Sequence, residues 1–158
     1  MKHESFNDQG IALLNKKQFN EALIFFEKAL QLKSDFTDAI NNLGITHHRL
    51  GELDQAVRLY KQVVASDPNY ALASDNKILN VIYFFSQGNI QDALETLNML
   101  VEINPTDALL FNMLGGCYAS IERPEMAIAN YQKALEFEPE YAIPKHMLNS
   151  LTGYTTKE

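Results

Sequence analysis

The sequence has a single cysteine, Cys117, and no apolar stretch long enough to span a membrane. One cysteine cannot form a disulfide within its own chain, which favours a reducing, cytoplasmic setting. A membrane-spanning helix needs about 20 apolar residues in succession. The start, MKHESFNDQG, also has no apolar run of the kind found in a secretory signal. We therefore expect a cytoplasmic protein without a membrane partner.

Glycine, proline and positive charge are also scarce. The 158 residues include 7 Gly and 5 Pro, too few for long disordered linkers, and 13 Lys and Arg against 20 Asp and Glu. The net charge of −7 and the pI near 5.1 disfavour nucleic acid as a partner, because a phosphate backbone binds a basic surface. The length suits one domain or a short array of repeats.

Patterns for catalysis, metal binding and nucleotide binding are missing as well. The sequence contains no GxxxxGKS or GxxxxGKT loop and no GxGxxG motif. His47 and His48 are adjacent, so on a helix their side chains point in different directions and do not chelate one metal. Cys117 lies in the segment GGCYA, which predicts a small buried thiol rather than a nucleophile. We expect no cofactor, no metal and no enzymatic activity.

What the chain does contain is one pattern present four times. Each copy has an alanine, an apolar or aromatic residue four positions later, and a small or apolar residue three positions after that. The alanines are Ala22, Ala56, Ala93 and Ala127, followed by Phe26, Tyr60, Leu97 and Tyr131 and then by Ala29, Val63, Leu100 and Ala134. Successive alanines are 34, 37 and 34 residues apart. Apolar residues at steps of three and four predict a helix in each copy.

A second apolar segment precedes each copy, and a turn signal separates the two. The upstream segments read FNDQGIALL, INNLGITHHRL, KILNVIYFF and FNMLGGCYASI. Three of them have a glycine at the matched position, and Gly51, Gly88 or Pro124 lies between paired segments. We expect Gly44 to face Ala56 so that two antiparallel helices approach closely.

This arrangement resembles the tetratricopeptide repeat family, whose pattern is bulky-x2-Leu-Gly-x2-Tyr, then Ala-x3-Phe, then Pro. The fourth unit matches best, through Phe111, Leu114, Gly115, Tyr118, Ala127, Tyr131, Ala134 and Pro139. The resemblance covers roughly residues 3 to 140. It implies an all-α fold, a solenoid with a right-handed superhelix, built from four helix-turn-helix repeats.

The predicted repeats span about residues 3–36, 37–70, 71–107 and 108–141. A one-sided apolar stripe then predicts a capping helix at 142–152, through Ile143, Met147, Leu148 and Leu151. We expect residues 1–152 to form a single domain, and residues 153–158 to form a frayed tail.

The third unit departs from the pattern in the stretch KILNVIYFFSQGN, residues 77–89. Seven of the eight residues from Ile78 to Phe85 are apolar, and the unit is three residues longer than the others. The extra residues are expected to add most of a helical turn. Gly88 matches Gly51, which places Val81 at the glycine position, where it is expected to push the two helices apart.

The resemblance also implies where a partner binds, because first helices line the concave face of such solenoids. The predicted groove is polar and acidic at its N-terminal end and apolar at the third and fourth units. Its residues are Asn7, Asp8, Ile11, Asp38, Asn41, Asn42, Ile45, Arg49, Ile78, Leu79, Ile82, Phe85, Asn112 and Met113. Apolar members would hold anchor side chains, asparagines would hydrogen-bond a peptide backbone, and aspartates would attract a basic ligand.

Other interpretations of the apolar stretch stay open. The extra turn could rotate Ile78 and Leu79 into the core, with Ile82 and Phe85 packing between helices. The patch could also serve self-association, as in a homo-oligomeric assembly module. Relatives that grip an acidic C-terminal tail use positions held here by Asn7, Ile11, Asp75 and Leu79, so a chaperone-tail clamp is not expected.

The leading prediction is a non-catalytic scaffold that binds a peptide or helix segment of a partner protein in the groove. The alternative concerns the end of the chain, HMLNSLTGYTTKE. It resembles the junction at which some bacterial repeat proteins pass into a methyltransferase domain. In that case the chain would be the substrate-recruiting N-terminal region of a larger enzyme.

Overall fold

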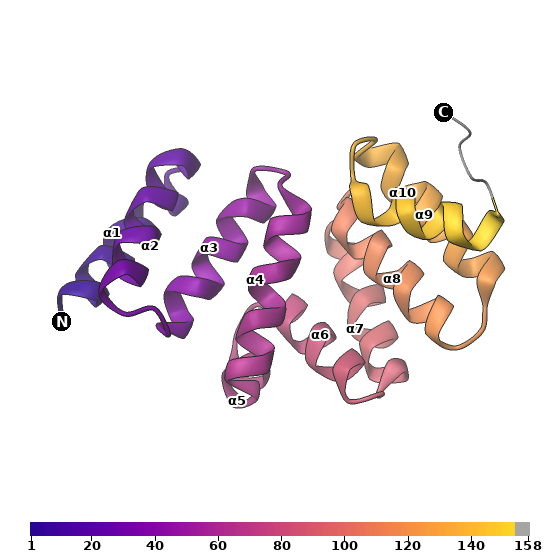
Figure 1. The fold of residues 1–158 in the computed structure, drawn as a ribbon, viewed down its shortest axis with the longest axis horizontal. Helices are drawn as coiled ribbons and strands as arrows, with labels where there is room; N and C mark the ends of the chain where they lie inside the picture. The colour runs from indigo at the N-terminus through magenta and orange to yellow at the C-terminus, as the bar shows by residue number, and fades with distance from the viewer. Residues whose placement is uncertain (154–158) are drawn as a thin grey trace. The chain divides into compact units, whose positions relative to one another are not determined.

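Helices follow the sequence repeat throughout the described part of the chain. The computed structural model describes residues 1–153, which contain ten helices and no strand (Figure 1). The helices are α1 (Lys2–Asn15), α2 (Phe19–Leu32), α3 (Thr37–Arg49), α4 (Leu53–Ser66), α5 (Pro68–Ala73), α6 (Lys77–Ser86), α7 (Ile90–Ile103), α8 (Ala108–Ser120), α9 (Pro124–Phe137) and α10 (Ala142–Thr152). The predicted all-α repeat fold is confirmed. Apart from Gly153, the predicted tail lies outside the described residues.

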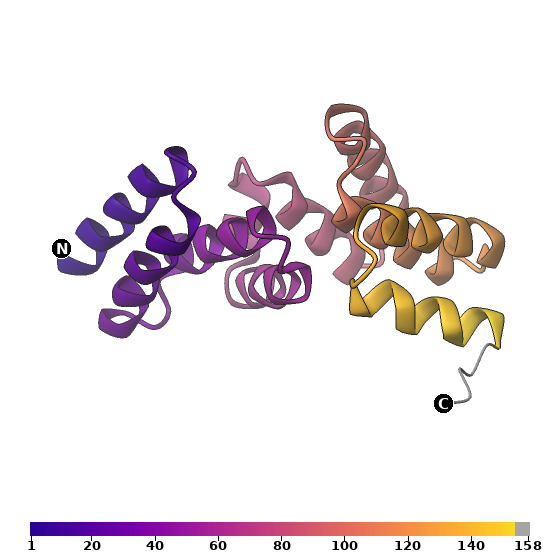
Figure 2. The same ribbon diagram turned by 90° about the horizontal axis from the view of Figure 1, so that it is seen from above.

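The chain divides into two compact units, one from Met1 to Ser74 and one that begins at Asp75. In the first unit, each helix from α1 to α5 packs against the next one along the chain. In the second, α6 packs on α7, α7 on α8, and α8 on α9. The capping helix α10 lies alongside α9 and also contacts α8, as both ribbon views show (Figures 1 and 2). The single domain expected for residues 1–152 stays a prediction.

The glycine in the middle of the first helix makes room for an aromatic ring. A Cβ atom on Gly44 would lie 2.7 Å from Cε1 of Tyr60, and one on Gly115 would lie 2.5 Å from Cε1 of Tyr131. Both rings are buried, at 0% and 1% exposure. The small residue is therefore required by the ring four positions after the alanine, and not by Ala56 as the sequence suggested.

The third repeat fills the same space with different residues. Val81 stands at the glycine position and is 1% exposed, whereas Leu97 stands at the aromatic position and is fully buried. A larger residue on the first helix is thus matched by a smaller one on the second. Cores tolerate such volume-conserving exchanges, which removes the reason to expect α6 and α7 to be pushed apart.

The three extra residues of the third repeat break its first helix instead of lengthening it. Asp67 starts α5 by accepting a hydrogen bond from the backbone N–H of Tyr70 at 2.9 Å, with Pro68 in the first turn. Ser74 then has an extended backbone, with φ −66° and ψ 145°. Asn76 restarts the helix as α6, because its side chain accepts from the N–H of Ile78 at 3.3 Å. Two capping side chains thus favour two short helices over one long one.

The turn inside each unit places one residue in the left-handed region. Gly51 and Gly88 have φ values of 79° and 76°. The matched positions in the first and fourth repeats are Lys17 and Glu122, with φ values of 61° and 56°. Left-handed backbone costs a residue with a Cβ atom about 1 kcal/mol. The same turn is therefore unstrained in the second and third repeats and strained in the first and fourth repeats.

Candidate interaction surface

In the first unit, asparagine side chains join the first helices of successive repeats. The Nδ2 group of Asn42 on α3 donates to Oδ1 of Asn7 on α1 at 3.0 Å. Asn7 is buried and Asn42 is half-buried. This bond sets α1 and α3 side by side along the surface predicted to bind a partner. It also occupies groups that were expected to bind a peptide backbone.

A tyrosine extends this polar network toward α5. Asn41 Nδ2 donates to the hydroxyl of Tyr70 at 3.4 Å, and that hydroxyl donates to Oδ1 of Asp38 at 2.9 Å. Burial raises the pKa of the Tyr70 hydroxyl well above its usual range, and the hydrogen bond to the Asp38 carboxylate raises it further. Asp38 itself remains exposed. Tyr70 thereby fixes the side chains of two predicted site residues.

The same device occurs in the second unit, with one difference. Asn112 Nδ2 on α8 donates to the hydroxyl of Tyr141 at 3.0 Å. Within residues 1–153, the buried Oδ1 atom of Asn112 has no hydrogen-bond partner. The third repeat has Ile78 at the matched position. An asparagine side chain therefore donates a hydrogen bond to a tyrosine from α3 and from α8, whereas α6 has an aliphatic side chain at this position.

Sequence reasoning did not single out Tyr70 and Tyr141. A usable signal was nevertheless present, because each tyrosine follows a proline by two positions, in DPNYA and EPEYA. Each also comes 29 residues after its asparagine partner. A repeat that keeps Asn and Tyr at this separation predicts a bridge between successive first helices.

The predicted groove residues differ widely in exposure. Asp8, Asp38, Arg49 and Phe85 are exposed. Ile11, Asn42, Ile45 and Met113 are half-buried, and Ile11 packs against the core of the first unit. Buried members are Asn7, Asn41, Ile78, Leu79, Ile82 and Asn112. The structure thus leaves a smaller accessible set than the sequence suggested.

The apolar stretch of the third repeat loses more of its predicted accessible residues than any other part of the groove. Ile78, Leu79 and Ile82 are 8%, 0% and 9% exposed, so their side chains belong to the core and cannot serve as open anchors. The reason is that α6 is apolar on several sides and buries four aliphatic residues, Ile78, Leu79, Val81 and Ile82. Phe85, one turn beyond Ile82, is 43% exposed. It is the one large apolar member of the predicted anchor group on α6 that reaches solvent.

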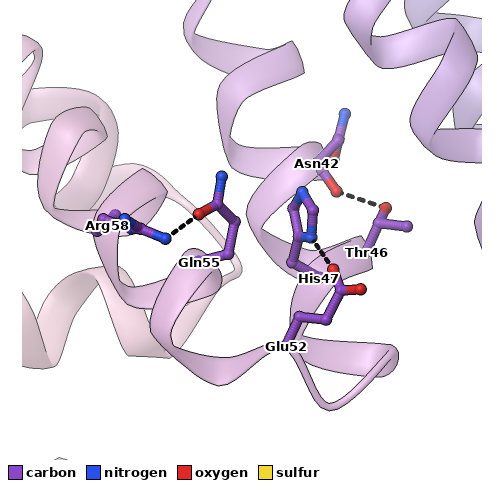
Figure 3. Close-up of polar contacts among 6 residues, drawn as sticks. All are labelled: Asn42, Thr46, His47, Glu52, Gln55 and Arg58. Atoms are coloured by element: carbon purple, nitrogen blue, oxygen red, sulfur yellow. Dashed lines mark hydrogen bonds and ion pairs between the residues drawn. The ribbon is translucent and has the colours of Figure 1, made fainter. Parts of the chain in front are cut away.

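A side-chain contact spans the turn from α3 to α4, and another lies within α3 just before it (Figure 3). His47 Nδ1–H donates to the Glu52 carboxylate at 2.5 Å, and the Thr46 hydroxyl donates to the backbone carbonyl of Asn42 at 2.7 Å. His47 takes the place of the tyrosine that is usual in the family. Its contacts give it a structural role in the turn.

Within the part of the chain that the structure describes, neither the cysteine nor the potential metal ligands form a reactive or metal-binding site. Cys117 is buried, and burial raises the pKa of its thiol to about 11, so the thiol stays protonated and unreactive at neutral pH. Among residues 1–153, no three side chains of His, Cys, Asp and Glu gather closely enough to hold a metal ion. No helix in the same range has the length and apolar character required to cross a lipid bilayer.

Comparison with models of protein families identifies the family of this chain. Two models described as tetratricopeptide repeat match it, one over residues 13–75 and the other over residues 108–141, together more than half of the chain. The chain is a tetratricopeptide repeat protein. This agrees with the resemblance drawn from the Gly, Ala and Pro positions, and the stretch between the two matches contains most of the unusual third repeat.

Three curated relatives are similar to this tetratricopeptide repeat protein. Anaphase-promoting complex subunit 7 of Dictyostelium discoideum is 27% identical over 129 residues, covering 78% of this chain and 21% of the relative. A peroxisomal targeting signal receptor of Candida albicans is 23% identical over 147 residues, covering 92% and 24%. The probable UDP-N-acetylglucosamine--peptide N-acetylglucosaminyltransferase SPINDLY of Hordeum vulgare is 29% identical over 135 residues, covering 83% and 14%.

The chain therefore spans a quarter or less of the length of each of these relatives. What it shares with them is the repeat region. Tetratricopeptide repeats present extended surfaces to other proteins, so the family indicates a role in protein–protein interaction.

Proposed function

We propose that this protein is a non-catalytic scaffold that binds a peptide or helix segment of a partner protein along its first helices. The observation that carries the proposal is the exposure of Phe85. Its side chain is 43% exposed on α6, a helix whose only charged residue is Lys77. An aromatic ring in an uncharged setting gains free energy when a partner covers it, roughly 25 cal/mol for each Å² of apolar surface buried.

The fourth repeat supports the same surface. Its first helix, α8, has no charged residue, and Met113 on it is half-buried. Methionine adapts its shape to different apolar partners, so Met113 and Phe85 are suited to hold the apolar side chains of a bound segment.

Taken by itself, the first unit presents charge rather than apolar anchors on its first helices. Asp8 and Asp38 are exposed on α1 and α3. Because the amides of Asn41 and Asn42 already bridge helices, the carboxylates are the more available polar groups, and they favour a ligand with basic residues. The names of the relatives, a complex subunit and a targeting signal receptor, support the binding of a protein segment.

Changing Phe85 to Asp tests the proposal. The variant should keep its helicity and lose, in a quantitative pull-down with the full chain, the partners that the unaltered protein retains, because a buried carboxylate opposes docking. Ile24→Asp is the matched control, since Ile24 is 49% exposed on a second helix, α2. Identical partner sets for Phe85→Asp and the unaltered chain would exclude this surface.

A second candidate function is recruitment of substrates to a catalytic domain of a longer protein. The SPINDLY relative favours it, because that relative is named as a glycosyltransferase and the shared repeats span only 14% of it. The methyltransferase junction suggested by HMLNSLTGYTTKE is one form of this idea. Reading the gene beyond codon 158 tests it, and a catalytic domain there would overturn the non-catalytic proposal.

Location and self-association belong to the same proposal. A cytoplasmic setting is supported by the lone, buried Cys117, which has no disulfide partner in the sequence. A homo-oligomeric assembly through Phe85 would instead appear as a mass that rises with concentration in light scattering. Phe85→Asp would abolish that rise.

A further inference from the structure

The outer side of α7 combines exposed apolar and acidic side chains. Met99 and Ile103 are 59% and 73% exposed and lie one turn apart. The acidic residues Asp92, Glu95 and Glu102 are also exposed. At 3.6 residues per turn, all five fall within an arc of about 100°. We call Asp92, Glu95, Met99, Glu102 and Ile103 the α7 face.

The second helix of the second repeat, α4, shows how different this face is. Shifting the α7 face by the 37-residue spacing gives Gln55, Arg58, Gln62, Ala65 and Ser66 on α4. That surface has one cation, whose guanidinium donates to the Gln55 side chain, and no large apolar residue (Figure 3). Two helices at matched places in the repeat therefore present opposite chemistry to solvent.

The first and fourth repeats also differ from the α7 face. Their residues at the Met99 position are Lys28 and Lys133. Each ammonium group covers an aromatic ring, with Lys28 Nζ 4.9 Å from the Phe25 ring centre and Lys133 Nζ 4.8 Å from that of Phe111. Among the four long second helices, α7 alone has no basic residue. On α7 itself, every charged residue is therefore acidic.

We propose that the α7 face is a second docking surface, for a basic amphipathic helix of a partner protein. Apolar side chains of that helix would cover Met99 and Ile103, and its Lys or Arg residues would pair with Asp92, Glu95 and Glu102. Opposite charges arranged around an apolar contact direct a partner and fix its register. This surface lies on a second helix, so it is separate from the first helices that carry Phe85.

Charge complementarity decides the occupant. Residues 75–158 contain 11 Asp and Glu against 5 Lys and Arg, and the whole chain has a net charge of −7. A second copy would bring more negative charge to an acidic face, which opposes self-association there. A basic partner segment is attracted instead, and that attraction weakens as salt screens the exposed carboxylates.

The test measures binding of the full chain to a labelled synthetic peptide made only of Leu and Lys, with its leucines at helical spacing. Met99→Gln/Ile103→Ser installs the residues of α4, and Glu95→Arg installs the α4 cation. Leu32→Ser is the matched control, because Leu32 is 53% exposed at the Ile103 position of α2. Circular dichroism checks that each variant keeps the helicity of the unaltered chain.

We expect the Met99→Gln/Ile103→Ser variant to bind the peptide about tenfold more weakly, because most of the apolar contact is lost. Glu95→Arg should weaken binding and reduce its dependence on salt. Leu32→Ser should change the affinity by less than about twofold.

Three results would overturn the proposal. Equal binding by the unaltered chain and by the Met99→Gln/Ile103→Ser variant would mean that the peptide responds only to net acidity. An absence of binding by the unaltered chain would mean that the α7 face does not bind a basic amphipathic helix. Concentration-dependent dimers that disappear in the same variant would identify a second copy as the occupant. Loss of Phe85-dependent partners alone would leave the α7 face unaffected, so the two surfaces are tested separately.

Discussion

The first compact unit and the third repeat, which opens the second unit, solve the same packing problem with different residues. The first unit places Gly44 against the ring of Tyr60, and it links its first helices through Asn7 and Asn42. The second unit begins with a repeat that uses Val81 and Leu97 and has Ile78 where the others have asparagine. One repeat plan therefore supports either a polar or an apolar surface on its first helices.

The charge of the chain follows the same division. Residues 1–74 contain 9 Asp and Glu and 8 Lys and Arg, whereas residues 75–158 contain 11 and 5. In the second unit, α6 has a single charged residue and α8 has none, and the acidic residues of the described range 75–153 lie on α7, on α9 and in the connecting segments. The difference teaches that apolar and acidic surfaces can be separated by helix within one repeat.

The largest expected effect comes from placing the core pair of the third repeat into the second repeat. Gly44→Val should lower the free energy of unfolding by about 3 kcal/mol, because the new side chain would overlap the Tyr60 ring. Adding Tyr60→Leu, the combination found in the third repeat, should restore part of this loss. Urea denaturation of the two single variants and the double variant measures the coupling. Simple additivity of the two losses would show that the pairs are not interchangeable.

Removal of the tyrosine hydroxyls should have a smaller effect and should differ between the units. Tyr70→Phe removes a hydrogen bond to a carboxylate and is expected to cost about 1.5 kcal/mol, whereas Tyr141→Phe should cost about 1 kcal/mol. Thermal denaturation measures both. Tyr118→Phe is the control and should be nearly neutral. Equal costs at Tyr70 and Tyr141 would contradict the role given to Asp38.

The Tyr70 hydroxyl also predicts a dependence on pH. Its pKa is raised in the folded protein, so the stabilising, protonated form persists after an unfolded tyrosine has titrated near about pH 10. The contribution is complete below that pH and is lost as the pH rises toward the folded pKa. The stability difference between the unaltered chain and Tyr70→Phe should therefore narrow above pH 10, and a constant difference would refute it.

The smallest expected effect is at the turns. Lys17→Gly and Glu122→Gly should each stabilise the fold by about 0.5 kcal/mol, since glycine relieves left-handed backbone but gains entropy when unfolded. Melting temperature measures the gain. Gly51→Lys is the reverse change in the second repeat and should destabilise. A loss of stability in Lys17→Gly would mean that the lysine side chain makes a contact that outweighs its strain.

Much of this architecture could be predicted because each repeat states it again. The helical spacing of Ala22, Phe26 and Ala29 recurs four times, so an error in one copy is corrected by the others. The candidate surface was harder. Phase along α6 placed Ile82 and Phe85 on the same side, but their exposures of 9% and 43% depend on which neighbours cover each turn.

The extra residues of the third repeat show where such prediction ends. Their number was readable, but whether they lengthen a helix or break it depends on competition between helix propagation and the caps at Asp67 and Asn76. The role of the asparagines also depended on distance. Asn42 meets Asn7 only because α1 and α3 pack at one particular register.

The sequence by itself determined the repeated helix pairs and the family, though not the break between α5 and α6, because the pairs depend on local periodicity and on small residues that recur at fixed spacing. Only the tertiary structure decided which side chains reach water. Ile78, Leu79 and Ile82 are covered while Phe85, Met99 and Ile103 are left open, since burial depends on the contacts made by every neighbouring helix.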